Sequence, residues 1–462
     1  MNLGIVPELA SSYFLPRLPG FQRAKEIMFF GEKMTAQQML EMEIVNKVLP
    51  HGELISYARE TALKHHPKGH GWQYGGDSYQ KMRPIYLDYN ATTPIDREVL
   101  EAMKPYLEEH FGNPSSSHWY GVQAKEAVEK ARGQVADLLN CSPGEIIFTS
   151  GGTESNNFAI KGAAFANRHK GNHIIISSIE HDAVTEVCRY LETKGFPLSY
   201  VPVDEAGVIN ITALEKTIMP ETVLISVMHA NNEVGTIQPI QEIAEIAGRH
   251  DIIVHTDAAQ SAGKTRTDVD ELGVDLLSIA GHKIYAPKGI GALYVREGIV
   301  LEKFMHGGGH ERDMRAGTGN VAAIVGLGKA CEIAKRALEE NCAHMKRMRD
   351  RLFDGLKERT SDVRLNGHPE KRIPNTLSVG FPNINASRLL PEMKEVAASG
   401  GSACHTGAAT VSSVLVAMGV PRNYARGTVR LSTGRMTTEE EIDRAIEIIS
   451  GAVERERIRL SM

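Results

Sequence analysis

Short apolar runs alternate with amphipathic segments along most of the chain after residue 83. The apolar runs predict strands at Glu145–Thr149, His173–Ser177, Val223–Met228, Ile252–Thr256, Leu276–Ala280 and Ile290–Val295. Segments with a helical period, among them 154–168 and 239–249, separate several of these runs. This alternation is typical of α/β architecture, in which helices cover both faces of a mainly parallel sheet.

The pattern differs at both ends of this region. Residues 322–357 are helical and charged, 374–381 are strand-like and 438–456 predict a long closing helix, so we expect a smaller α+β subdomain. Near the start, Thr93 followed by Pro94 predicts a helix with Thr93 as its N-cap. The apolar positions of that helix are Ile95, Val99, Met103 and Leu107.

The first 83 residues are organised differently. Residues 65–83 are rich in His and Gly without an apolar period, and they predict a linker. Its histidines lack a geometrically fixed partner, so we expect no metal site there. Before it, we expect helices over 21–30 and 51–64 and a helix from Thr35 through Met42. About 64 residues make only a marginal hydrophobic core on their own.

Composition narrows the class of protein. The net charge of −5 and the pI near 6.4 disfavour a nucleic-acid partner. No apolar run reaches the roughly 20 residues that a membrane span needs, and Met1–Gly4 shows no secretory signal. The 5 cysteines form no CxxC pair, which disfavours a disulfide framework or a structural zinc site. We therefore expect a reduced, soluble, cytoplasmic enzyme with no metal.

Ligands of such sheets bind at the carboxyl ends of the strands, so the loops there are candidate sites. Ser150–Thr153 contains two glycines before a helix, which suits either a phosphate site or a tight turn. Asp257 follows a buried strand and needs a cationic partner. A protonated pyridine nitrogen and a plain salt bridge both satisfy that need.

Two further loops carry candidate nucleophiles. Lys283 ends the strand before it and could form a Schiff base if burial lowers its pKa, or it could be a surface lysine, as we expect for Lys288. Cys404 lies in the small-residue loop Gly400–His405, where an exposed thiol can act as a nucleophile. The other cysteines read as packing residues.

Longer motifs occur along the same region in a fixed order. They are Ile85–Pro94, Phe111–His118, Phe148–Asn157, Glu180–His181, His229–Gly235, His255–Ser261, His306–Arg312 and Arg430–Arg435. In this order they resemble the cysteine desulfurases, pyridoxal-phosphate enzymes of the class V aminotransferase group that supply sulfur for iron–sulfur assembly. The resemblance covers residues 84–462.

The resemblance implies an α/β fold of the type I pyridoxal-phosphate transferases. In that fold a large subdomain would span about 97–338, and a small α+β subdomain would combine about 84–96 with 339–462. It also implies a homodimer and the conversion of L-cysteine into L-alanine. The sulfur would remain on the enzyme as a cysteine persulfide and pass to an acceptor protein such as an iron–sulfur scaffold.

The family's catalytic roles transfer to matching positions. Lys283 matches the lysine that forms the Schiff base with pyridoxal 5'-phosphate and later moves the Cα proton. Cys404 matches the cysteine whose thiolate attacks the substrate sulfur. His181 matches the histidine that stacks on the cofactor ring and handles protons. Asp257 is expected to hold the ring nitrogen protonated, and Gln260 to contact the phenolic oxygen.

Further residues match the family's binding positions. The phosphate cup corresponds to Gly152, Thr153 and His282. Thr318 matches a threonine that reaches the phosphate from the partner subunit, which implies the homodimer. Asn232 and Arg430 match the site for the substrate carboxylate, where an arginine can bind both oxygens.

The chain departs from the family pattern in three places. Many members have a serine where Ala280 stands, so one phosphate hydrogen bond worth about 1 kcal/mol should be missing. Cys404 is followed by His405, which is similar to selenocysteine lyases and makes that activity the alternative. The chain ends at Met462, short of the tail that docks the scaffold in other members.

Residues 1–64 resemble another family. Leu3–Leu18 and the stretch from Ala36 to Pro50 are similar to the middle-to-late part of the crotonase (enoyl-CoA hydratase) family. The oxyanion-hole loops and catalytic glutamate of that family precede the matching part. We interpret 1–64 as a truncated crotonase-like appendage, and the alternative is an acyl-CoA-binding or interaction module.

Overall fold

The computed structural model describes residues 35–41, 47–50, 53, 83–400 and 411–461. The chain divides into two compact units, Met1–Arg83 and Pro84–Met462. In the first unit, helix α3 (Ala36–Glu41) begins after Thr35, whose Oγ1 accepts from the Gln38 backbone at 3.2 Å. The Gln38 side chain accepts from the Thr35 backbone in return, at 2.8 Å, which is a capping box.

This pair confirms the predicted helix start at Thr35. The helix predicted over 21–30 lies outside the described residues, as does nearly all of 51–64 and of the linker.

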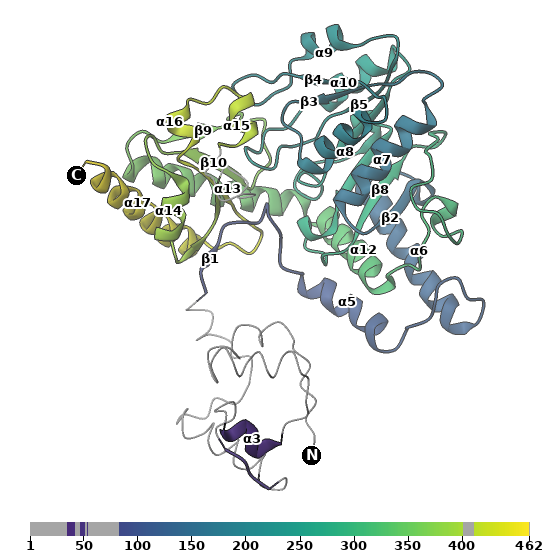
Figure 1. Ribbon diagram of the computed structural model, residues 1–462, viewed down its shortest axis with the longest axis horizontal. Coiled ribbons are helices and arrows are strands. Elements are labelled where there is room, and N and C mark those ends of the chain that lie inside the picture. The colour runs from purple at the N-terminus through teal and green to yellow at the C-terminus, as the bar shows by residue number, and fades with distance from the viewer. Residues whose placement is uncertain (1–34, 42–46, 51–52, 54–82, 401–410, 462) are drawn as a thin grey trace. The chain divides into compact units, whose positions relative to one another are not determined.

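A seven-stranded sheet forms the centre of the second unit (Figure 1), in the order β2-β8-β7-β6-β5-β3-β4. Its strands are β2 (Ile146–Thr149), β3 (His173–Ser177), β4 (Leu198–Val201), β5 (Thr222–Ser226), β6 (Ile253–Asp257), β7 (Leu276–Ala280) and β8 (Gly291–Val295). All neighbours run parallel except β8, which is antiparallel to both β2 and β7. The prediction of a mainly parallel sheet is confirmed. Strand β4 was missed because it is a partly exposed edge strand without an apolar run.

Helices cover both faces of this sheet. They are α5 (Arg97–Glu108), α6 (Trp119–Leu139), α7 (Gly152–Ala166), α8 (Asp182–Glu192), α9 (Ile211–Thr217), α10 (Ile240–Gly248), α11 (Val269–Leu272) and α12 (Val321–Arg336). Along β2, Ile146 and Phe148 pack into one core with α5, α6, α10 and α12, whereas Ile147 packs into another with α7 and α8. Because both faces are buried, the strands read as continuous apolar runs.

The smaller part combines an antiparallel sheet with helices. The sheet has the order β12-β13-β10-β9, formed by β9 (Arg364–Asn366), β10 (Thr376–Gly380), β12 (Ser399–Gly400) and β13 (Thr428–Ser432). The helices are α13 (Leu338–Arg359), α14 (Ala386–Glu392), α15 (Ser413–Ala417), α16 (Arg422–Ala425) and α17 (Glu439–Ser461). Strand β1 (Ile85–Tyr86) pairs in parallel with β11 (Val396–Ala397), so the chain begins this unit in the smaller part.

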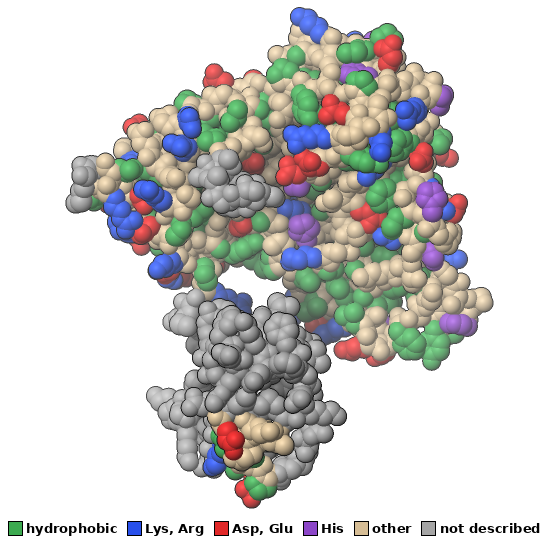
Figure 2. Space-filling view, viewed as in Figure 1, with side chains coloured by type: hydrophobic (Ala, Val, Ile, Leu, Met, Phe, Trp, Pro, Cys, Tyr) green, Lys and Arg blue, Asp and Glu red, His purple; other side chains and the backbone are tan. Residues whose placement is uncertain are grey.

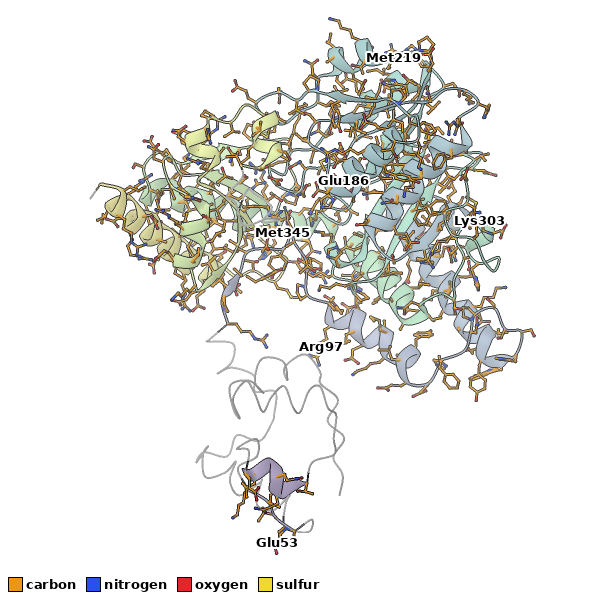
Figure 3. All side chains as sticks on the ribbon, in the orientation of Figure 1. Glu53, Arg97, Glu186, Met219, Lys303 and Met345 are labelled. Carbon is orange, nitrogen blue, oxygen red and sulfur yellow. The ribbon has the colours of Figure 1, made fainter. Side chains whose placement is uncertain are left out.

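The region 322–357 is helical, as predicted, and the chain forms two helices there that meet at Ala337. Helix α12 packs Leu327 and its neighbours against the large sheet, whereas α13 packs Leu352 and its neighbours into the smaller core. Met345 of α13 lies where the two parts meet (Figure 3). No glycine or proline marks this break, because the division follows from which core each helix joins.

The predicted N-cap at Thr93 is also wrong. Helix α5 begins at Arg97, and the side chain of Asp96 accepts from the Glu98 backbone at 2.6 Å. The Thr93 hydroxyl is buried instead, where it donates to the backbone oxygen of His282 at 3.0 Å and accepts from the backbone of Tyr285 at 2.9 Å. The Thr93 side chain therefore makes tertiary hydrogen bonds and does not cap the helix that the local sequence predicts.

No helix among the described residues is both long enough and apolar enough to span a lipid bilayer.

Candidate active site

A cavity of about 230 Å³ opens at the carboxyl edge of the large sheet, among the loops that follow its strands. Most of the predicted site residues line it: Gly152, Thr153, His181, Asn232, Asp257, Gln260, His282 and Lys283. They come from segments far apart in the sequence, which the parallel strands bring to one edge. Thr318 and Arg430 are not among its lining residues, and Cys404 lies outside the described residues.

Asp257 ends β6 and is buried, 7% exposed. One carboxylate oxygen accepts from Asn156 Nδ2 at 2.7 Å, and the other accepts from the backbone of Ala259 at 2.9 Å. Within the described part of the chain, no lysine or arginine forms an ion pair with Asp257. The plain salt bridge is therefore not observed, and a protonated nitrogen in the cavity would supply the charge that this carboxylate needs.

Sequence reasoning gave no role to Asn156, which holds Asp257 in place. It lies one turn into α7, within the motif Phe148–Asn157. Its amide nitrogen is used by Asp257, and its Oδ1 is buried with no hydrogen-bond partner among the described residues. The position of Asn156 on the helix that follows the glycine-rich loop was the feature of the sequence that could have indicated a role in the site.

Lys283 lies in the turn Gly281–Lys283, directly after β7. Its Nζ donates to the backbone oxygens of Asn90 and, at 2.9 Å, of Ala91. Burial and the nearby Arg430 guanidinium lower the pKa of Lys283 to about 8. Part of the amine is therefore unprotonated at neutral pH, as a nucleophile requires. Lys288, by contrast, is exposed, as expected.

The part of the cavity wall formed by the start of α7 suits an anion. Helix α7 begins at Gly152 without a side-chain cap, so its first N–H groups face the loop unpaired by a side chain. Gly151 before it has a φ of +150°, which favours glycine. Burial, with Lys283 next in effect, lowers the pKa of His282 to about 4, so its ring is neutral. Ala280 lines the same cavity close to Gly152 and offers no hydroxyl.

His181 is the N-cap of α8, and its Nδ1 accepts from the backbone of Ala183 at 3.0 Å. Because that nitrogen is an acceptor, the neutral ring carries its proton on Nε2. The backbone of the helix start thus fixes both the tautomer and the position of the ring at the wall of the cavity.

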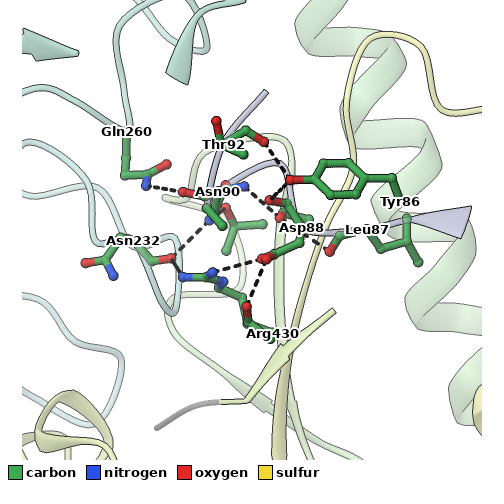
Figure 4. Close-up of polar contacts among 12 residues, drawn as sticks. Tyr86, Leu87, Asp88, Asn90, Thr92, Asn232, Gln260 and Arg430 are labelled. Atoms are coloured by element: carbon green, nitrogen blue, oxygen red, sulfur yellow. Dashed lines mark hydrogen bonds and ion pairs between the residues drawn. The ribbon is translucent and has the colours of Figure 1, made fainter. Parts of the chain in front are cut away.

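Arg430 lies on β13 beside this wall (Figure 4). Its Nη1 donates to the backbone oxygen of Asn232 at 3.1 Å, and its Nη2 donates to Asp88 Oδ1 at 2.9 Å. The other oxygen of Asp88 accepts from Ser399 Oγ at 2.9 Å. The Nε of Arg430 is buried and has no partner among the described residues, so the guanidinium keeps an unused donor.

Asn90 connects the smaller part to the cavity (Figure 4). Its backbone oxygen accepts from Lys283 Nζ and, at 2.9 Å, from Gln260 Nε2. Its side-chain nitrogen donates to Asn232 O at 3.1 Å and to Thr376 Oγ1 at 2.7 Å. The motif Ile85–Pro94 contains both Asp88 and Asn90, but its spacing gave no sign that either contacts the site.

Thr318 lines a different cavity, of about 380 Å³, together with Ser115, Arg132, Arg312 and Arg315. Glu311 binds Arg132 at 2.7 Å, and Glu154 binds Arg315 at 2.8 Å, so these two cations are paired. Because Thr318 lines this second cavity, it does not line the cavity that contains Lys283 of the same chain.

The model of the aminotransferase class-V family matches residues 85–445, and that of the enoyl-CoA hydratase/isomerase family matches residues 1–70. A cysteine desulfurase IscS of Methanosarcina thermophila is 49% identical over 377 residues, 81% of this chain and 93% of its own. One from Vibrio vulnificus strain CMCP6 is 50% identical over 379 residues, 81% of this chain and 94% of its own.

Solved structures that are similar to this chain indicate the same family. A NifS-like protein superposes with a TM-score of 0.76 at 41% identity, covering 80% of this chain and 99% of its own. SspA in complex with cysteine superposes with a TM-score of 0.67 at 40% identity, covering 76% of this chain and 99% of its own. These neighbours confirm the type I pyridoxal-phosphate fold. The chain belongs to the class-V aminotransferase family, among its cysteine desulfurases.

Proposed function

We propose that residues 84–462 convert L-cysteine into L-alanine with pyridoxal 5'-phosphate and keep the sulfur as a persulfide on Cys404. One observation carries the cofactor assignment: Lys283, with its pKa lowered to about 8, lines the same cavity as Asp257, a buried carboxylate without an ion-pair partner among the described residues. An amine nucleophile and an unpaired carboxylate together suit an aldehyde cofactor with a basic ring nitrogen.

The cavity residues would hold the cofactor in one orientation. Asp257 would bind the ring nitrogen, and Gln260 would contact the phenolic oxygen. The phosphate would be bound by the start of α7 at Gly152 and Thr153, with His282 beside it. When bound, the cofactor supplies an electron sink for the bonds at the substrate's Cα. His181 would cover the ring face.

The remaining groups act on the substrate. Arg430 and Asn232 would bind the cysteine carboxylate, and the unpartnered Nε of Arg430 leaves a donor for it. Lys283 in its neutral form would take the proton from Cα. The Cys404 thiolate would then form a bond to the substrate sulfur while the substrate's carbon–sulfur bond breaks. The electron pair of that bond would stay on the substrate, which would take up protons at Cβ and Cα, so that the products are a persulfide on the enzyme and alanine.

A homodimer is part of this proposal, because Thr318 and the cavity it lines lie apart from Lys283 within one chain. Exposed aromatic side chains support a partner surface between α5 and the start of α6, where Phe111 is 75% exposed and Trp119 61% exposed. Phe111 stacks on Tyr120 with ring centroids 5.3 Å apart, and Figure 2 shows hydrophobic side chains at this end of the molecule. An aromatic surface of this kind is typical of a protein contact.

The domain assignment stays as the sequence suggested: a crotonase-like segment 1–64, a linker 65–83, and a desulfurase of two subdomains. The pairing of β1 with β11 supports placing 84–96 with the smaller subdomain. We propose a cytoplasmic location and an acceptor protein such as an iron–sulfur scaffold. An acyl-CoA-binding role for the first segment is the alternative of another class, and the match of residues 1–70 to the enoyl-CoA hydratase/isomerase family favours testing it by titrating the full chain with an acyl-CoA.

The central experiment measures alanine and persulfide formed from cysteine by the holoenzyme, with selenocysteine as the competing substrate. His405 after Cys404 is the observation that favours selenocysteine lyase as second candidate. Alanine with equimolar persulfide from cysteine would support the desulfurase. Selenide release from selenocysteine with no turnover of cysteine would show the lyase instead.

A further inference from the structure

Lys264 is a buried lysine to which neither the motifs nor the proposed mechanism assign a role. It follows the loop Asp257–Gln260, it is 4% exposed, and its backbone N–H donates to Ser261 O at 2.9 Å. Its Nζ donates to the backbone oxygen of Gln260 at 3.1 Å and to Gln260 Oε1 at 3.2 Å. No carboxylate among the described residues pairs with it. A buried ammonium without a carboxylate lowers stability, so its presence calls for another explanation.

The two polar ends of the Gln260 side chain have partners that permit only one orientation of the amide. Gln260 Oε1 accepts from Lys264, whose ammonium can only donate. Gln260 Nε2 donates to the backbone oxygen of Asn90 at 2.9 Å, and a carbonyl can only accept. An amide nitrogen has a second N–H, and Gln260 lines the cavity that contains Lys283. The group that Gln260 offers to a ligand there is therefore a donor.

We propose that Lys264 is a positioning residue for the cofactor: it holds the Gln260 amide with its N–H group toward the cavity, where it donates to the ionised phenolic oxygen. The inference rests on the proposed function and deepens it. Lys264 touches neither cofactor nor substrate and acts through Gln260. Without its ammonium, the amide could rotate and present its oxygen, which repels an oxyanion.

The charges around Lys264 are consistent with this role. Burial, together with Lys283 and Arg430, lowers the pKa of Lys264 to about 7, and the thiol of Cys342 opposes them. Cys342 on α13 donates to Lys264 O at 3.0 Å. The carboxylates that face the neighbouring Lys283 are Asp257 and Asp88. About half of Lys264 is therefore charged at pH 7, and an anionic oxygen in the cavity would favour the charged form behind the Gln260 amide.

The test replaces Lys264 by methionine, which has similar length and no donor, with Lys335→Met, an exposed lysine of α12, as the matched control. The absorbance of each substrate-free holoenzyme is titrated with pH. Loss of a donor and a positive charge near the phenolic oxygen raises the proton affinity of the bound cofactor, so the K264M midpoint should rise by about one pH unit. The cofactor dissociation constant should rise about fivefold or more. K335M should match the wild type in both.

Two further measurements separate positioning from other effects. In the Gln260→Ala background, the K264M substitution should shift the midpoint by less than half as much, because the residue through which Lys264 acts is gone. The melting temperature of K264M apoprotein should stay equal or rise, since an unpaired buried ammonium has been removed.

An equal shift in both backgrounds would overturn the positioning role, as would a lower melting temperature with an unchanged midpoint. A wild-type protein that binds no pyridoxal phosphate would overturn the proposed function and this inference together. If the wild type binds the cofactor but the K264M substitution leaves the pH midpoint of its absorbance unchanged, the inference alone would be overturned.

Discussion

Arg430 on β13 donates through Nη2 to Asp88 Oδ1 at 2.9 Å, so a carboxylate from the start of the second unit balances the cation proposed to bind substrate. Both side chains are largely buried, and Ser399 Oγ donates to the second Asp88 oxygen. Asp88 and Arg430 act on Lys283 with opposite sign, because the carboxylate raises and the guanidinium lowers the pKa of its amine. The reactivity of Lys283 therefore depends on this pair.

Asp88→Asn should lower the pKa of Lys283 below about 8, because a carboxylate that favours the charged amine has been removed. The rate at which apoprotein binds pyridoxal phosphate is proportional to the neutral fraction of the Lys283 amine. The midpoint of the pH profile of this rate should therefore shift to lower pH. Stopped-flow absorbance measures this rate. Ser399→Ala is the matched control, since it removes a hydrogen bond to Asp88 without changing the charge. An equal shift in the control would contradict the electrostatic explanation.

Lys283→Ala should abolish the visible absorbance of the bound cofactor and reduce alanine formation by about 10³-fold or more. The reason is that both the covalent link and the proton transfer at Cα are assigned to this amine. Lys288→Ala, an exposed lysine in the same segment, should keep both properties. If K283A keeps the absorbance band and K288A loses it, then Lys288, and not Lys283, forms the covalent link to the cofactor.

Cys404→Ser should keep the cofactor and still bind cysteine, yet form no persulfide, because a hydroxyl is a far weaker nucleophile than a thiolate. Burial raises the pKa of the Cys188 and Cys331 thiols well above their usual range, so neither can replace it. Mass spectrometry after persulfide labelling measures the outcome. A label on Cys188 or Cys331 in the wild type would refute the assignment.

Glu180→Gln should flatten the dependence of stability on pH. Burial raises the pKa of Glu180 from its ordinary 4.5 to about 8, so the folded protein keeps a proton that the unfolded chain releases. This contribution to stability is complete below about pH 4.5 and is lost as the pH rises through 8. The free energy of unfolding, measured with denaturant at pH 5 and at pH 8, changes between the two pH values. This change should be smaller by a few kcal/mol in the variant than in the wild type.

The control for this comparison is Glu186→Gln, an exposed residue of α8, the helix that begins two residues after Glu180. It should leave the pH dependence of unfolding as in the wild type. Parallel stability curves for Glu180→Gln and the wild type would mean that Glu180 is ionised in the folded protein.

Removing residues 1–83 should leave alanine formation per active site nearly unchanged. The chain divides at Arg83, and every described residue of the cavity lies beyond it. Steady-state alanine production and sedimentation of the truncated and full chains measure the effect. A tenfold loss of turnover, about 1.4 kcal/mol in activation free energy, with the cofactor fully bound would make the segment part of the enzyme.

The hydrophobic pattern was enough to predict all strands of the large sheet except β4, together with most of the residues that line the cavity. The strands are buried on both faces, so their apolar runs stand out, and β3 and β7 have the predicted bounds. Because parallel strands end at one edge, the polar residues that follow them could be placed together before any contact was known. Lys283 and Asp257 were found in this way, and the longer motifs named the chemistry.

The contacts that hold these residues in place depend on how distant parts of the chain pack together. Asp88 meets Arg430, Asn90 meets Lys283, and Thr93 leaves its expected helix cap for the His282 backbone, each across far more chain than any local pattern spans. Lys264 is a further example, because a lysine in a loop reads as solvent-exposed until the surrounding cores are assembled. Hydrophobic periodicity reports which face of an element is buried. It carries no information on which distant polar group satisfies a buried donor, since that depends on how the packed elements meet.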